Sequence, residues 1–140
     1  MVVCERFSAG REKYKIEAIL IDSRRDLTLW IGGGTSPHVG AIALGIPRPS
    51  LEDPYSTSAS VSVLCLTGHK EDDWARKLAH HLAKEFNKPI VVTLGIHIDN
   101  ITQVEMELIR ESFDNLVEQV VAFQQESLEL KSIGEMEKSL

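Results

Sequence analysis

The sequence has no hydrophobic run long enough to cross a membrane, and its two cysteines are not placed as a metal or redox motif. A membrane-spanning helix needs roughly 18 consecutive apolar residues, and no such run occurs. The first thirteen residues also contain no apolar stretch of signal-peptide length. Cys4 and Cys65 form no CxxC pair, and the apolar surroundings of Cys65 predict a buried, reduced thiol. Together these absences predict a cytoplasmic protein.

The chain is also poor in unopposed positive charge. Its net charge is −6, and acidic residues interleave with the few basic clusters. Nucleic-acid phosphates and anionic membrane surfaces both require a basic face on the protein. We therefore expect neither nucleic acid nor a membrane as a partner.

The size and composition are those of one globular domain. Of the 140 residues, 43% are apolar and 26% are charged, which allows a substantial core. We predict a loose leader at residues 1–13 and a single domain at 14–126. A frayed or disordered tail is expected at 127–140, where Glu and Lys alternate around Gly134.

The hydrophobic pattern predicts an α+β fold with the order β-β-β-β-α-β-α. Alternating or continuous apolar residues predict strands at 14–22, 27–32, 38–46, 57–66 and 90–96, with an exposed proline-containing loop at 47–56. Helical spacing of apolar residues predicts one helix at about 70–86 and another from 102 onward. Thr102 and Glu105 form a capping box at the start of the second helix.

These elements are expected to form a two-layer sandwich. Its mostly antiparallel sheet of about five to six strands has both helices on one face. The β-α-β step predicts one parallel or crossover pair. The other face of the sheet then needs cover, and a homodimer is one way to supply it.

Three polar turns stand out because each contains glycine and a histidine: residues 32–40, 67–70 and 95–100. In the first, Gly32, Gly33 and Gly34 allow positive φ and close approach to the backbone, and their N–H groups can form an anion-binding nest. A tight connection between strands would use the same residues. The turn matches neither the Walker phosphate-binding loop nor the dinucleotide fingerprint.

The other two turns flank the first predicted helix and the strand after it. His69 and Lys70 lie at a helix N-terminus, which favours anions, although His69 or Thr67 can equally serve as a cap. His97 and Asp99 share one face at the end of the central strand, so Asp99 can fix the imidazole tautomer for general-base or metal chemistry. Alternatively they form a buried pair that bonds the turn backbone, with Asn100 as a helix cap.

A metal-dependent enzyme is one hypothesis for these turns. His38, His69, His97 and Asp99 are numerous enough to bind zinc or iron, but their spacing does not show that they converge. We therefore assign no metal ligand. His80 and His81 are expected on the surface of the first helix, and no G-x-S-x-G elbow supports a serine nucleophile.

The same turns carry a resemblance to a known family. The chain is similar to the prenylated-flavin chaperone LpdD-like domains, which are small accessory proteins of the hydroxyarylic acid decarboxylases of the gallate, vanillate and 4-hydroxybenzoate types. The similarity covers roughly residues 14–120. It depends on two segments, GGGTSPHVGAIALG at 32–45 and TGHKEDDWARKLAHHLAKEFNKPIVVTLGIHIDN at 67–100.

The resemblance implies an accessory protein that does not itself perform the decarboxylation. It implies a UbiD-type decarboxylase as partner, prenylated FMN as the cofactor that is handled, and a fold like the dimeric proteasome-assembly-chaperone domains. The cofactor-binding residues expected from it are Gly33, Gly34, His38, His69, Lys70, His97, Asp99 and Asn100. A small His/Asp-dependent enzyme and a purely structural assembly chaperone remain the alternatives. We also predict that His38, His69 and His97 lie on one rim of the fold.

Overall fold

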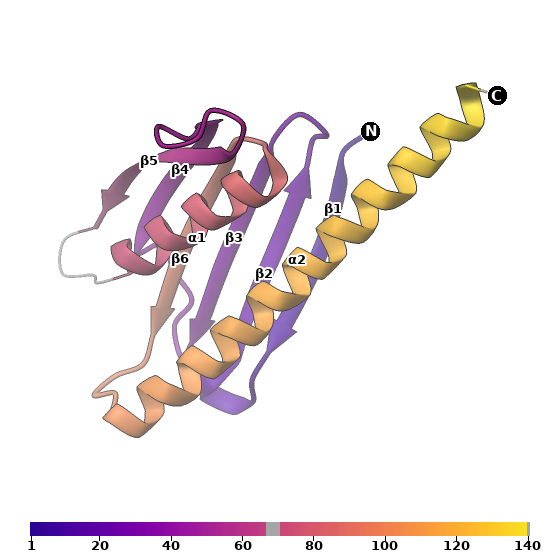
Figure 1. Ribbon diagram of the computed structural model, residues 1–140. Coiled ribbons are helices and arrows are strands. Elements are labelled where there is room, and N and C mark those ends of the chain that lie inside the picture. The colour runs from indigo at the N-terminus through magenta and orange to yellow at the C-terminus, as the bar shows by residue number, and fades with distance from the viewer. Residues whose placement is uncertain (67–70, 140) are drawn as a thin grey trace.

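A computed structural model describes residues 1–66 and 71–139 (Figure 1). Five strands come first, then a helix, a sixth strand and a long second helix. The strands are β1 (Val3–Ala9), β2 (Ile16–Asp22), β3 (Leu27–Gly34), β4 (Ala41–Pro49), β5 (Thr57–Cys65) and β6 (Ile90–His97). The helices are α1 (Asp72–Phe86), α2 (Gln103–Ser139) and a short 3-10 turn, η1 (Glu12–Tyr14).

The six strands form one sheet in the order β1-β2-β3-β6-β4-β5. β6 lies between β3, to which it is parallel, and β4, to which it is antiparallel. The remaining neighbours are antiparallel, so β5 and β6 run the same way with β4 between them. This is the predicted crossover. Both helices lie on one face of the sheet (Figure 1), which confirms the two-layer α+β sandwich.

The core lies between the sheet and the helices. Alternate residues of each inner strand face the helices and are buried, among them Ile16, Leu29, Val92 and Ala43. α1 covers β4, β5 and β6, and α2 covers β1 and β2. Small residues allow α1 to lie close to the sheet, because a Cβ on Gly45 would come within 2.5 Å of the Ala79 carbonyl oxygen. This close packing sets how near α1 lies to β4.

The opposite, open face of the sheet carries apolar residues in two rows across the strands. The strand register aligns Ile19, Trp30, Thr93, Ile42 and Leu64 in one row, and Ile21, Thr28, Val91, Leu44 and Ser62 in the next. Ile42 and Leu44 are 36% and 38% exposed, and Leu64 is 74% exposed. An apolar surface of this kind is typical of a protein interface.

β1 occupies part of the segment that was predicted to be a loose leader. Its full register with β2 runs from Val3–Asp22 to Ala9–Ile16, so the strand order begins with five strands and not four. The side chain of Phe7 explains why this segment is ordered, because its ring contacts Phe123 of α2 edge-to-face at 5.6 Å. The sequence pattern did not predict this strand, because its helix-facing residues include the polar Glu5, which interrupts the apolar alternation.

α2 continues to Ser139, through the segment that was predicted to be a frayed tail. Figure 1 shows this end of the helix projecting beyond the sheet. The apolar pattern weakens there because the helix no longer packs on the sheet, whereas Glu, Leu, Lys and Met still favour helix intrinsically. Among the described helices, none is both long and apolar enough to cross a bilayer.

Smaller differences concern the strand ends and Cys65. β4 runs to Pro49, so the exposed loop is shorter than the predicted 47–56. β4 begins at Ala41, whereas the strand was predicted from residue 38. The described part of the first helix begins at Asp72, compared with about residue 70 in the prediction. Cys65 is exposed and not buried, because burial decreases along the edge strand β5 from Ala59 toward its last residue.

Candidate functional site

The parallel pairing of β3 and β6 brings two of the predicted turns together. Gly34 at the end of β3 pairs with His97 at the end of β6. Because parallel strands end at the same edge of a sheet, the turns that follow them share this edge. We call the described part of this edge the histidine rim and define it as residues 33–40, Glu71 and residues 95–100.

His38 and His97 are neighbours on the histidine rim, as predicted. Their ring centres lie 6.0 Å apart, with the ring planes at 77°. Backbone hydrogen bonds fix the turns that carry them: the Thr35 N–H donates to the His97 carbonyl at 2.8 Å, and the His38 N–H donates to the Gly95 carbonyl at 3.4 Å. The convergence therefore follows from the backbone of both turns.

The glycines of these turns serve close packing between backbones. A Cβ on Gly95 would overlap the His38 carbonyl group, and one on Gly34, whose φ is +77°, would overlap the His97 carbonyl group. Only glycine therefore fits at either position without a shift of the chain.

Of the two interpretations of the glycine turn, backbone hydrogen bonds favour a tight connection between strands over an anion-binding nest. The N–H groups of Gly34, Thr35 and Gly40 donate to the carbonyls of Lys15, His97 and Leu94. Gly33 lies within the β3 ladder, paired with Ile16 and Ile96. These N–H donors are therefore used in hydrogen bonds within the fold, and a ligand at the rim would contact side chains instead.

Hydrogen bonds orient both imidazole rings. Nδ1 of His38 lies 2.9 Å from the Ser36 carbonyl oxygen, which can only accept, so this nitrogen carries the proton and Nε2 faces Glu71 Oε1 at 3.6 Å. Nε2 of His97 lies 2.8 Å from Asp99 Oδ1. A carboxylate also accepts, which leaves Nδ1 of a neutral His97 as the acceptor nitrogen.

The two histidines are accessible from solvent. The side chains of His38 and His97 are 24% and 46% exposed, and that of Asp99 is 84% exposed. The alternative of a buried His–Asp pair is therefore wrong. Asn100, at φ +52°, is not the helix cap, since Thr102 Oγ1 accepts from the Glu105 N–H and Glu105 Oε1 accepts from the Thr102 N–H.

Glu71 is a rim residue that was not singled out as a candidate from the sequence. Its side chain is 14% exposed and turns toward His38. Gly40 permits this approach, because a Cβ there would come within 2.8 Å of the Glu71 carboxyl group. In the sequence, this contact is signalled by an acidic residue at the start of a helix and by a glycine, Gly40, in another turn. These two residues indicate a contact only once the packing of α1 against β4 is known.

The second predicted turn, with His69 and Lys70, lies outside the described residues. The structure therefore places two of the three predicted histidines, His38 and His97, on the rim. In the described part of the chain, no group of three or more His, Cys, Asp or Glu side chains is arranged to bind a metal ion.

Comparison with known proteins places this geometry in a family. Residues 10–125 match the model of the prenylated flavin chaperone LpdD-like domain. The chain belongs to this family. It is 24% identical over 127 residues to protein LpdD of Lactiplantibacillus plantarum (strain ATCC BAA-793 / NCIMB 8826 / WCFS1), a match that covers 85% of this chain and 84% of that protein. Family membership supports a chaperone-like role.

The fold is also similar to a solved structure of a chaperone complex for yeast 20S proteasome assembly. The TM-score is 0.54 at 16% identity, and the match covers 89% of this chain and 98% of that chain. At this identity the likeness shows a shared fold. It agrees with the predicted similarity to proteasome-assembly-chaperone domains.

Proposed function

We propose that this LpdD-like protein is an accessory, chaperone-like protein that binds prenylated FMN for a UbiD-type decarboxylase. The observation that carries the proposal is the convergence of His38 and His97, from two separate turns, on an exposed edge of a domain that belongs to this family. The protein would hold the cofactor or help to transfer it, and the decarboxylase would perform the chemistry.

The described rim residues fit the polar edge of a flavin ring better than its phosphate. Glu71 and Asp99 add negative charge beside the two imidazoles, which disfavours a phosphate group there. An isoalloxazine edge offers both N–H donors and carbonyl acceptors, and the imidazoles and carboxylates can pair with both kinds. A phosphate contact would depend on Lys70, which lies outside the described residues.

A homodimer is part of the proposal. The open face of the sheet exposes Ile42, Leu44 and Leu64 in register across neighbouring strands. A second copy packed on this face would bury these side chains and leave the histidine rim, at the strand ends, free for the cofactor.

A second candidate function is supported by the His97–Asp99 pair. A histidine with one nitrogen bonded to a carboxylate at 2.8 Å is arranged as an acid–base group or a metal ligand would be. Metal analysis of the purified protein, with and without a chelator, tests this alternative. A bound metal that His97→Ala removes would favour an enzyme over a carrier.

Cofactor delivery is the direct test of the proposed function. Prenylated FMN is mixed with the protein, and a cofactor-free UbiD-type decarboxylase is then added. We expect faster or more complete formation of active decarboxylase than with free cofactor. An identical rate of activation, together with no association between the two proteins, would exclude this role.

A further inference from the structure

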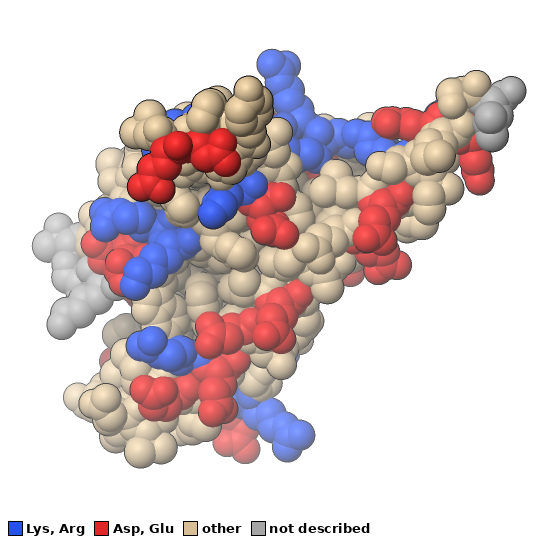
Figure 2. Space-filling view, viewed as in Figure 1, with Lys and Arg blue, Asp and Glu red and all other residues tan. Residues whose placement is uncertain are grey.

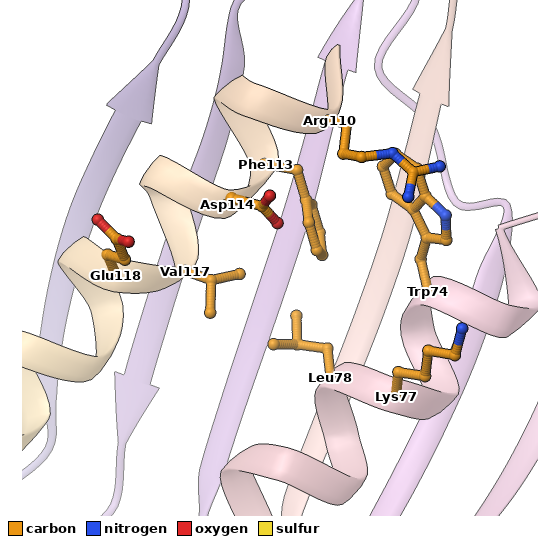
Figure 3. Close-up of a pocket in the computed structure, with 8 residues that line it drawn as sticks. All are labelled: Trp74, Lys77, Leu78, Arg110, Phe113, Asp114, Val117 and Glu118. Carbon is orange, nitrogen blue, oxygen red and sulfur yellow. The ribbon is translucent and has the colours of Figure 1, made fainter. Parts of the chain in front are cut away.

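A groove separates the two helices on the outer side of the molecule, and the proposed function does not use it. α1 packs over β4, β5 and β6 while α2 packs over β1 and β2, so the helices diverge above β3. The groove between them has a volume of about 520 Å³ (Figure 3). Its lining residues are Trp74, Lys77 and Leu78 of α1 and Arg110, Phe113, Asp114, Val117 and Glu118 of α2.

The floor of the groove is apolar and partly aromatic. Trp74 and Phe113 contact each other across the two helices, with ring centres 4.9 Å apart. Both rings are only half-buried, as is Val117, whereas Leu78 beside them is buried. In an amphipathic helix packed on a sheet, the apolar stripe is normally covered by the sheet. Here part of the stripes of both helices turns toward the groove and is left accessible.

The walls of the groove carry ordered charge. Along α2, Arg110, Asp114 and Glu118 follow one another at intervals of four residues, so this wall changes from basic to acidic over about two helical turns. The Arg110 guanidinium lies 5.7 Å from the centre of the Trp74 ring, at the basic end. Lys77 adds a cation on the α1 wall, where it pairs with Asp73 at 2.9 Å.

We propose that this groove docks an amphipathic helix of a partner protein. The helix would place its apolar stripe on Trp74, Phe113 and Val117, with an acidic side chain toward Arg110 and a basic one toward Glu118. Two helices with an apolar floor and charged walls form the kind of groove that accepts a third helix. Figure 2 shows the surface between the two helices as largely uncharged, with basic and some acidic side chains on the α1 side and mainly acidic ones along α2. This proposal is independent of the histidine rim.

The charge order of the groove determines the probe. Three labelled helical peptides would share one apolar stripe: a bipolar peptide with Glu at one end and Lys at the other, a peptide with only Glu, and a peptide with only Lys. Binding is followed by fluorescence polarisation. In a Trp30→Phe background, Trp74 is the remaining tryptophan of the chain, and its emission reports directly on the groove.

We expect the bipolar peptide to bind best to the wild-type protein. Arg110→Glu makes the α2 wall uniformly acidic, so the preference should move toward the Lys peptide by about tenfold. Arg76→Glu, which makes the same charge change at an exposed position of α1 that does not line the groove, is the matched control and should leave the preference unchanged.

Two results would overturn the proposal. One is that the bipolar peptide fails to bind, or that Arg76→Glu and Arg110→Glu have the same effect on the three peptides. The other is that Arg110→Glu alters self-association of the protein and leaves peptide binding unchanged, which would make a second copy the occupant.

Discussion

At the residue scale, the histidine rim depends on glycines whose role is steric. Gly95 gives room to the His38 carbonyl, Gly34 to the His97 carbonyl, and Gly40 to the Glu71 carboxyl group. Each glycine thus permits one contact between segments that are distant in sequence. The arrangement of His38 and His97 follows from these contacts. Even a small side chain at any of the three glycine positions should therefore disturb it.

Gly95→Ala tests this steric role. The added Cβ would overlap backbone atoms of His38, which cannot rotate away as a side chain can, so the turn must shift. We expect a loss of about 1–3 kcal/mol in the free energy of unfolding, measured by denaturant titration. Gly134→Ala is the control, because nothing lies within 4 Å of its added Cβ. Equal stability of Gly95→Ala and wild type would show that the turns are not closely packed.

Glu105 gives a prediction for the pH dependence of stability. The Lys13 ammonium at 2.7 Å and hydrogen bonds from Thr102 and Tyr14 lower the pKa of Glu105 from 4.5 to about 2. A pKa that is lower in the folded state stabilises the fold above the unfolded pKa. This contribution should therefore be lost as the pH falls from 4.5 to about 2.

The measurement compares wild type with Glu105→Gln, because other carboxyl groups titrate in the same range. The wild type should be more stable at neutral pH, and the difference between the two proteins should shrink toward pH 2. A difference that stays constant across this range would mean that the ion pair with Lys13 does not stabilise the fold.

At the element scale, the sequence predicted most of the strands and both helices because their apolar residues face one shared core. The capping box of Thr102 and Glu105 was also predictable, since its two hydrogen bonds join residues three apart. β1 and the last part of α2 were not predicted. β1 is specified by pairing with β2 and by the contact of Phe7 with Phe123, and neither is visible in a short window of sequence.

The projecting end of α2 gives a prediction at this scale. Gly134 lies within the helix, and glycine costs about 1 kcal/mol relative to alanine in a helix interior. Gly134→Ala should raise the helical circular dichroism signal. The midpoint of global unfolding should hardly change, because this part of α2 lies beyond the sheet. A large rise in the midpoint would show that the segment unfolds together with the core.

At the scale of the whole molecule, the open face of the sheet exposes apolar side chains that a second protein surface would cover. Leu44 lies on this face in β4, next to the edge strand β5, and is 38% exposed in the single chain. Leu44→Lys should convert the proposed homodimer to a monomer with little loss of secondary structure, measured by sedimentation velocity. Ala122→Lys, an exposed position on α2, is the control and should remain dimeric. A wild-type protein that is monomeric at high concentration would contradict the dimer.

The sequence predicted the existence of the rim better than its chemistry. His38 and His97 were expected together, but the participation of Glu71 depends on how α1 packs against β4. The availability of the glycine N–H groups depended on backbone partners in β6 and before β2, which no local pattern specifies. The residue types were therefore enough to predict which turns form the rim. Which polar groups of these turns are left to contact a ligand depends on the backbone hydrogen bonds of the folded chain.

Equilibrium binding of prenylated FMN tests most directly whether the histidine rim is the working surface. Titrations followed by flavin absorbance or fluorescence would compare wild type, the double variant His38→Ala with His97→Ala, and His81→Ala as an exposed control on α1. We predict that wild type and His81→Ala bind alike and that the double variant binds at least about tenfold more weakly, a loss of about 1.4 kcal/mol. Equal binding by all three proteins would contradict this assignment of the site.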